Sequence, residues 1–333
     1  MKRIWNRHGR VFGLHLDLTW GCPLRCVHCC LPRHRDGSGE LPAGAWVRVL
    51  DEAARMGVFQ VTLSGGDPMA RRDFWTVLEA ARERLFLVIL KTTGLRVTSA
   101  VAARIARMRH VIVDVSLHGG PEEHDRIVGM PGAHRRTVAA VRLLRAAGVR
   151  TRVMALAVAV NMADVERVVA ACAAMDVECR ATTGVWPVVD GTGLSHLAAS
   201  QEDRARFERQ TWAPRLEGPL PAIDPAGPLC GAARGTLYVS PRGVVQPCAS
   251  WPVPLGDVRR DGLEAAWRGA AAEAVRRLAT ADRRACTGCA LLAMCPFCPG
   301  ASQATAGDPT APNRTSCSQA DVVRRIRDGE VPR

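Results

Sequence analysis

Cysteine spacing constrains this chain of 333 residues more than any other feature, because ten of its 13 cysteines form two groups. The first group is Cys22, Cys26 and Cys29, three thiols on one short loop. The second group lies in the last third of the chain: Cys230, Cys248, Cys286, Cys289, Cys295, Cys298 and Cys317. The N-terminus has no apolar segment of a secretory signal, so we expect a cytoplasmic protein with reduced thiols. Cysteines in that setting predict metal ligands or redox groups rather than disulfides.

The amino-acid composition argues against several classes of protein. A hydrophobic fraction of 47% supports a sizeable core and excludes bulk disorder. The longest uncharged apolar run, residues 153–160, is far shorter than the ~20 residues of a membrane helix, so we expect no membrane partner. The net charge of +13 comes from scattered arginines without a block of five. Aromatic and basic positions do not alternate, which argues against a nucleic-acid substrate.

Strand-like and helix-like segments alternate through the first two thirds of the chain. The strands are expected at 14–19, 58–63, 85–90, 110–117, 150–158 and 177–186. The helices are expected at 42–56, 72–84, 98–108, 135–147 and 162–175. Such alternation is typical of a parallel sheet with right-handed crossovers. We therefore expect an α/β domain over residues 10–195, a partial (β/α)6 TIM-like barrel whose site lies just after the strands.

Residues 196–333 do not continue this alternation of strands and helices. We expect a helix and a Pro/Gly-rich bridge over 196–229, then a small loop-rich domain over 230–320, and a C-terminal helix or tail over 321–333. Residues 237–240 and 244–246 predict a β-hairpin, and 261–279 a helix. From Cys286 to Cys317 the sequence has little periodicity, so this segment needs metal or disulfides to become ordered.

Three thiolates on one loop can hold three irons of a cubane cluster and leave the fourth iron without a protein ligand. An open iron implies that the cluster binds something small. The alternative is a zinc knuckle with His28 or Cys30 as the fourth ligand, and a zinc ribbon for the later C-x2-C pairs. On that alternative the chain would be a zinc-stabilised basic binding protein.

The Cys22-x3-Cys26-x2-Cys29 loop after the first strand and the Gly65-Gly66-Asp67-Pro68 turn after the second resemble the radical S-adenosylmethionine (SAM) superfamily over residues 11–195. The resemblance implies that the open iron chelates SAM and that one electron splits SAM into methionine and a 5′-deoxyadenosyl radical. That radical would abstract a hydrogen atom from the substrate. A reductant protein of the flavodoxin or ferredoxin type would supply the electron.

The same resemblance assigns SAM contacts by position. Gly65 and Gly66 match the glycines of the family's GGE turn, and Asp67 stands in place of its Glu. Thr93, with Thr92 and Gly94, matches the loop after the third strand, and Ser116 matches a serine near the SAM carboxylate or ribose. The family's Arg position is Val128 here, so the nearest substitute is Arg126. For each of these residues taken alone, ordinary turn chemistry is the alternative.

Residues 230–320 resemble the SPASM extension of radical SAM enzymes, with one residue fewer than usual before the sixth cysteine. The resemblance implies two auxiliary [4Fe–4S] clusters, which makes three clusters in all. One auxiliary cluster would be bound by Cys286, Cys289, Cys295 and Cys317. The other would be bound by Cys230, Cys248 and Cys298, and its fourth iron would be open, bound by a group other than cysteine, or bound by the substrate.

Three cysteines and the substrate remain to be placed. Cys172 is expected in the core, Cys30 in loop packing, and Cys179 either in the core or inside the barrel as a hydrogen donor. The 124–129 segment and the seven later cysteines resemble peptide maturases, including those for pyrroloquinoline quinone and mycofactocin. This implies maturation of a ribosomally made peptide by crosslinking, oxidation or epimerisation. Because the chain begins almost at the first strand, we expect a separate leader-peptide-binding protein. The alternative is a dehydrogenase or epimerase of an aminoglycoside or other sugar-containing small molecule.

Overall fold

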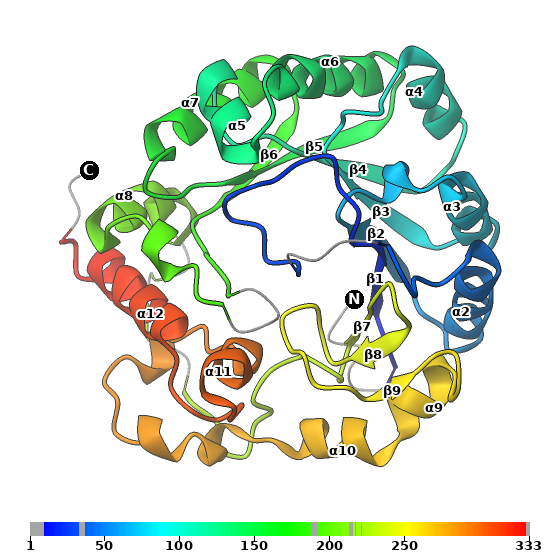
Figure 1. Ribbon diagram of the computed structural model, residues 1–333. Coiled ribbons are helices and arrows are strands. Elements are labelled where there is room, and N and C mark those ends of the chain that lie inside the picture. Colours follow the sequence, from blue (N-terminus) through cyan, green and yellow to red (C-terminus); the bar gives the residue numbers. More distant parts are fainter. Residues whose placement is uncertain are drawn as a thin grey trace.

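The computed structural model describes residues 10–32, 37–187, 192–212, 216, 218–220 and 222–330. Within these ranges one nine-stranded sheet runs in the order β6-β5-β4-β3-β2-β1-β7-β8-β9. Figure 1 shows the strands curving round a central space with the helices outside them. The sheet does not close between β6 and β9, which confirms the α/β partial barrel.

Six parallel strands form the barrel wall, as expected. They are β1 Gly13–Thr19, β2 Gln60–Gly65, β3 Leu87–Thr92, β4 Val111–Ser116, β5 Arg150–Leu156 and β6 Glu178–Thr182. The expected helices are present as α2 Ala43–Arg55, α3 Phe74–Glu83, α4 Ser99–Ala106, α6 Ala133–Ala146 and α7 Met162–Ala174. The structure adds α5, Pro121–Val128, which the sequence interpretation missed. Pro121 starts this helix and Gly129 ends it with a φ of 68°, two local signals that the wider pattern obscured.

The main core lies between the sheet and the outer helices. Strand side chains such as Leu16, Leu63 and Leu90 are fully buried there against Trp46 and Leu78 of the helices. Alternate strand residues point the other way, into the barrel, because side chains in a strand alternate between its two faces. Burial of each large apolar side chain contributes about 1.5–3 kcal/mol, so the outer faces of the strands hold the wall in place.

The C-terminal region is joined to this sheet. The expected hairpin forms from β7 Thr236–Val239 and β8 Val244–Gln246, followed by β9 Gly256–Asp257. β7 pairs parallel with β1, and Tyr238 lies opposite His15. The hairpin therefore extends the barrel wall, which its sequence alone did not indicate. The helix expected over 261–279 is two helices, α9 Leu263–Arg268 and α10 Ala270–Arg277, because the backbone of Gly269 is extended.

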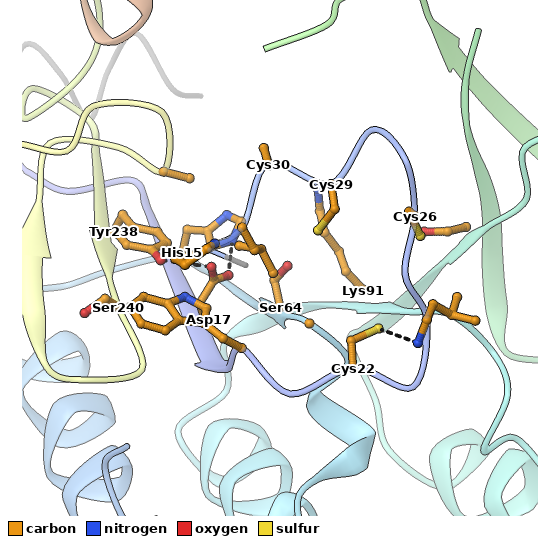
Figure 2. Close-up of a pocket in the computed structure, with 18 of the residues that line it drawn as sticks. His15, Asp17, Cys22, Cys26, Cys29, Cys30, Ser64, Lys91, Tyr238 and Ser240 are labelled. Atoms are coloured by element: carbon orange, nitrogen blue, oxygen red, sulfur yellow. Dashed lines mark hydrogen bonds and ion pairs between the residues drawn. The ribbon is translucent and has the colours of Figure 1, made fainter. Parts of the chain in front are cut away.

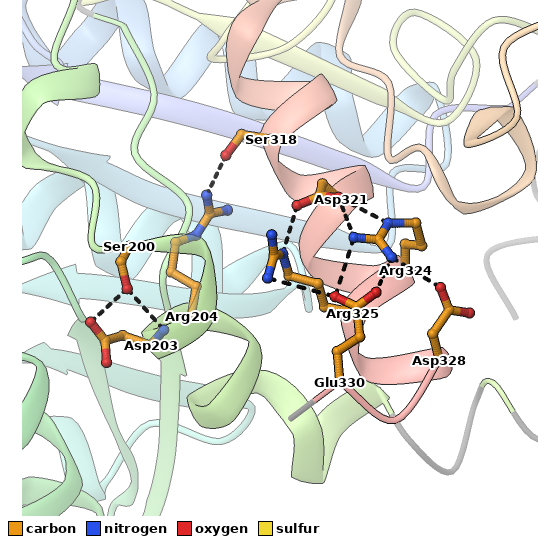
Figure 3. Close-up of polar contacts among 9 residues, drawn as sticks. All are labelled: Ser200, Asp203, Arg204, Ser318, Asp321, Arg324, Arg325, Asp328 and Glu330. Carbon is orange, nitrogen blue, oxygen red and sulfur yellow. Dashed lines mark hydrogen bonds and ion pairs between the residues drawn. The ribbon is translucent and has the colours of Figure 1, made fainter. Parts of the chain in front are cut away.

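The last helices close the ring in Figure 1. α8 (Gln201–Trp212) packs against α12 (Arg314–Arg327), and α11 (Pro299–Ala306) lies between the hairpin and α12. Figure 3 shows Arg204 of α8 reaching Ser318 of α12, where the guanidinium donates to the hydroxyl over 2.8 Å. Arg204 is 4% exposed and also donates to Thr183 after β6, so it joins three segments. No helix in the described ranges is long and apolar enough to cross a membrane.

Candidate active site

A cavity of about 630 Å³ opens where the central strands end. Its wall contains the three thiols of the first cysteine group and four of the predicted SAM contacts: Gly65, Gly66, Thr93 and Ser116. β7 contributes Tyr238, and Ser240 follows it. Figure 2 shows this arrangement, with the loop of Cys22, Cys26 and Cys29 on one side and Tyr238 on the other. The two motif regions of the barrel and the C-terminal hairpin thus face one space.

The cysteine loop is held against the end of α5. The backbone N–H groups of Arg25 and Val27 donate to the carbonyls of Val128 and Ile127, at 2.8 and 3.0 Å. Leu24 is buried beneath the loop in a small apolar cluster with these two residues. The backbone of the loop that carries the three thiols is therefore fixed on both sides of Cys26. Among the described residues no three His, Cys, Asp or Glu side chains converge closely enough to share a single metal ion.

Gly65 and Gly66 are required by close packing of the turn on the start of this loop. A Cβ at Gly65 would lie 2.0 Å from the carbonyl oxygen of Thr19, and one at Gly66 would lie 2.2 Å from that of Gly21. Gly65 also has a φ of +122°, which other residues rarely adopt. The absence of side chains keeps backbone groups of the turn on the cavity wall, where a small polar cofactor could reach them. This cradle fits the predicted SAM site.

Asp67 is turned away from the cavity and is fully buried. Its carboxylate accepts hydrogen bonds from the hydroxyls of Thr93 and Thr92, at 2.5 and 3.1 Å, and from the N–H of Met69. Burial raises the pKa of Asp67, while these hydrogen bonds oppose that shift. Asp67 therefore ties the end of β2 to the end of β3 and positions Thr93, rather than lining the cavity itself.

Two predicted site residues lie elsewhere. The side chain of Arg126 is 59% exposed on α5, where it pairs with Glu123, whereas Val128 lines the cavity. Cys179 of β6 hydrogen-bonds with Cys172 of α7, and this contact, together with burial, raises the pKa of the Cys179 thiol. Cys179 thus faces the helix layer and not the cavity, because its position on β6 has the outward parity of the strand.

The sequence interpretation missed a polar cluster on the opposite wall. The hydroxyl of Tyr238 donates to Oδ2 of Asp17 over 2.9 Å, and Nε2 of His15 lies 3.0 Å from Oδ1. Burial and the nearby Asp17 carboxylate raise the pKa of Tyr238, so its hydroxyl stays protonated and serves as the donor. His15 and Asp17 alternate along β1, which could have indicated an inward polar face. Nothing local could have placed Tyr238 beside them.

The rings of three histidines lie next to one another beside the cysteine loop, His118 edge-on to His28 and stacked on His124. The ring centroids of His28 and His118 are 4.5 Å apart, and those of His118 and His124 are 5.9 Å apart. Burial lowers the pKa of His28 and of His124 to about 4. Nδ1 of His118 accepts from the N–H of Leu156, and Nδ1 of His124 accepts from that of His118. These rings are therefore neutral near pH 7 and add no positive charge behind the thiols.

The later cysteines fall into two sets of electrostatic neighbours. The thiols of Cys230, Cys248 and Cys298 influence one another, and burial, followed by the two neighbouring thiols, raises the pKa of Cys248 to about 12. Cys295 is influenced by Cys286, Cys289 and Cys317, and its pKa is raised to about 11, chiefly by burial. These are the two ligand sets implied by the resemblance. Thiols gathered in this way fit sites that bind a metal cluster as thiolates.

Comparison with known proteins gives the same assignment. The radical SAM superfamily profile matches residues 17–172, and the SPASM profile, an iron–sulfur cluster-binding domain, matches residues 230–290. PqqA peptide cyclase from Granulibacter bethesdensis is 30% identical over 281 residues, covering 78% of this chain and 74% of that protein. Mycofactocin maturase MftC from Mycobacterium tuberculosis is 36% identical over 132 residues, covering 40% of this chain and 34% of that protein.

Two solved structures share the fold. Streptococcus suis SuiB, bound to precursor peptide SuiA, has a TM-score of 0.73 at 16% identity and covers 94% of this chain and 78% of SuiB. The anSMEcpe protein with bound AdoMet has a TM-score of 0.73 at 14% identity and covers 96% of this chain and 97% of that protein. The sequence matches, together with the cysteine loop, the glycine turn and the partial barrel, show that the chain belongs to the radical SAM superfamily and carries a SPASM iron–sulfur cluster-binding domain.

Proposed function

We propose that this enzyme modifies a ribosomally made peptide by hydrogen abstraction, leading to a crosslink, an oxidation or an epimerisation. The observation that carries the proposal is the 30% identity to PqqA peptide cyclase over 74% of that protein's length. The alternative, a sugar-containing small molecule as substrate, is not favoured by these relatives. The cavity of about 630 Å³, walled by both the barrel and the hairpin, has room for a residue of a peptide beside a cofactor.

The residues of the first site have separable tasks in this proposal. Cys22, Cys26 and Cys29 hold a [4Fe–4S] cluster, and the backbone at Gly65 and Gly66 holds SAM together with Thr93 and Ser116. When bound, this pair of cofactors supplies one-electron cleavage of the SAM sulfonium and abstraction of a substrate hydrogen atom. Asp67 fixes the hydroxyl of Thr93, and the apolar contacts below Leu24 keep the loop in place.

The later cysteines hold two auxiliary [4Fe–4S] clusters. Cys286, Cys289, Cys295 and Cys317 bind one, and Cys230, Cys248 and Cys298 bind the other, for whose fourth iron this assignment leaves no cysteine. Cys230 and Cys248 flank the β7–β8 hairpin, so the second of these sites and the Tyr238 wall of the cavity share one element. We propose the corresponding division of the chain, with residues 10–195 for radical formation and 230–320 for the auxiliary clusters.

Two partner proteins follow from this chemistry. The electron comes from a reductant of the flavodoxin or ferredoxin type, because amino-acid side chains are not one-electron donors of that strength. A separate protein binds the leader segment of the peptide and delivers the core segment to the cavity.

The test uses the anaerobically purified, reconstituted protein with SAM, dithionite and a precursor peptide encoded beside its gene. We expect 5′-deoxyadenosine together with a modified peptide. A crosslink or oxidation removes two hydrogens from the peptide mass, whereas epimerisation in D2O adds one deuterium. Zinc without iron in the purified protein, or 5′-deoxyadenosine without any peptide change, would overturn the proposal.

A further inference from the structure

The ionisable groups around the cavity favour an anion. Its lining contains one carboxylate, Asp17, and two permanent cations, Lys91 and Arg242. Both oxygens of Asp17 are already engaged, one by the Tyr238 hydroxyl and the other by His15. The hydroxyl of Tyr238 and the ring of His15 therefore shield the negative group, while the positive charge of Lys91 remains on the wall.

Lys91 is the cation whose surroundings are most informative. It is on β3, in register with Asp114 of β4, which would be its natural ion-pair partner. The carboxylate of Asp114 instead binds Arg152 of β5 through two contacts, at 2.7 and 3.0 Å. In the part of the chain that the structure describes, the Lys91 ammonium makes no hydrogen bond or ion pair, and its charge acts on the thiol of Cys30 at the cavity wall. Figure 2 shows Lys91 under the loop that carries Cys29.

The residue type supports a specific task. Of the 45 lysines and arginines in the chain, only Lys2 and Lys91 are lysines. Everywhere else the chain satisfies its need for positive charge with arginine, whose planar fork favours two parallel contacts. Lysine offers a compact charge on a flexible stem, which suits one contact with a single carboxylate in a narrow space. A partly buried ammonium without a protein partner is stabilised only by water or by a bound anion.

We propose that Lys91 binds a carboxylate of the substrate, and so selects peptides with an acidic side chain or a free C-terminus next to the carbon that reacts. This inference rests on the proposed peptide substrate. The rival source of a carboxylate is SAM itself. The predicted SAM contacts Gly65, Gly66 and Thr93 lie at the strand ends, whereas Lys91 precedes Thr93 by two residues and its Cα is about 6.6 Å further down the strand. Its Cα therefore lies deeper in the barrel than the predicted SAM contacts, and we assign this deeper part of the cavity to the substrate.

The small number of lysines makes a direct test possible without turnover. Reconstituted enzyme saturated with SAM is treated with the N-hydroxysuccinimide ester of acetic acid, and acetylation of Lys91 and Lys2 is followed by peptide mass spectrometry. The probes are the α-amide of N-acetyl-L-glutamic acid, which carries one side-chain carboxylate, and its neutral counterpart, the α-amide of N-acetyl-L-glutamine. We expect the glutamate derivative to slow acetylation of Lys91 several-fold, with no effect of the glutamine derivative and no effect on Lys2.

Three results would overturn the proposal: equal protection by both probes, no protection by either, or full protection by SAM alone without a probe. The last result would assign the ammonium to the SAM carboxylate. A failure of the proposed function looks different, because it appears as an unmodified peptide and leaves the labelling pattern intact.

Variants extend the test to the peptide reaction. Lys91→Met keeps the length of the side chain and removes its charge, and Lys91→Arg restores a charge. We expect Lys91→Met to raise the KM for an acidic peptide about tenfold or more, a loss that appears in the KM for peptide rather than for SAM. Lys91→Arg should reverse part of this rise in the KM for the acidic peptide. Arg277→Met, which removes an exposed charge from α10, is the matched control for net charge and should behave as the wild type. An equal rise of KM for acidic and amidated peptides would contradict the assignment.

Discussion

The hydroxyl of Tyr238 donates a 2.9 Å hydrogen bond to the carboxylate of Asp17, 221 residues earlier in the chain. The bond is buried and lies beside the parallel pairing of β7 with β1. It joins the hairpin between Cys230 and Cys248 to the barrel wall. The cavity is therefore completed by the C-terminal region, and the geometry of the substrate side depends on that region being docked.

The Tyr238–Asp17 bond predicts coupling between the two regions. Tyr238→Phe removes the donor and leaves one carboxylate oxygen unpaired, so we expect a loss of about 1–3 kcal/mol in the free energy of unfolding. Urea unfolding of the apoprotein measures it. In a double-mutant cycle, Asp17→Asn and Tyr238→Phe should be non-additive, whereas additive losses would mean that the bond contributes little.

The cysteine assignments predict a sharp contrast between two thiols. Cys26→Ala should abolish formation of 5′-deoxyadenosine and lower the iron content, because it removes a proposed cluster ligand from the loop. Cys179→Ala should keep both, since Cys179 packs with Cys172 between β6 and α7. If Cys179→Ala instead stops deuterium incorporation into a peptide while SAM cleavage continues, its side chain reaches the substrate after all.

The glycine turn predicts a packing defect. Gly66→Ala would place a Cβ 2.2 Å from the backbone oxygen of Gly21, so the turn or the cysteine loop must move. We expect a loss of about 1–3 kcal/mol, seen in thermal unfolding of the apoprotein, and poor iron incorporation. Gly44→Ala is the control, because this glycine lies in α2 with nothing within 4 Å of the added atom. It should stabilise the protein by about 0.5–1 kcal/mol.

His124 predicts a dependence of stability on pH. Burial lowers its pKa from 6.5 to about 4, with smaller contributions from His134 and Asp125 that oppose each other. The unfolded chain therefore binds a proton that the folded chain does not, and stability falls as the pH drops from 6.5 towards 4. The loss should reach about 3 kcal/mol.

Urea unfolding of the apoprotein over this pH range tests the expectation. His124→Gln should make the slope shallower, because glutamine does not titrate, while His28, whose pKa is also lowered to about 4, keeps its own contribution. An unchanged slope in this variant would assign the effect to other buried groups.

Sequence patterns predicted most of the barrel because they are local. The six strands and their helices follow from alternating apolar segments, and α6 and α7 appear within a few residues of their expected bounds. The orientation of single side chains was harder to predict from the sequence than the strands and helices themselves. A shift of one position reverses the face of a strand residue, which is why the sequence left Cys179 either in the core or inside the barrel, whereas the structure packs it against α7. Arg126 was assigned by its nearness to a family position, although the turn of α5 points it outward.

By itself, the sequence determined the chemistry of the cluster site: three thiols within eight residues, and two glycines directly after a strand. Only the tertiary structure decided what faces that site. The pairing of β7 with β1 depends on backbone hydrogen bonds at a sheet edge. Because these backbone groups are the same for almost every residue type, they do not specify which strand will pair there. Tyr238 and Asp17 therefore meet through long-range docking, which no spacing along the chain could have revealed, and Lys91 of β3 lines the cavity that this docking completes.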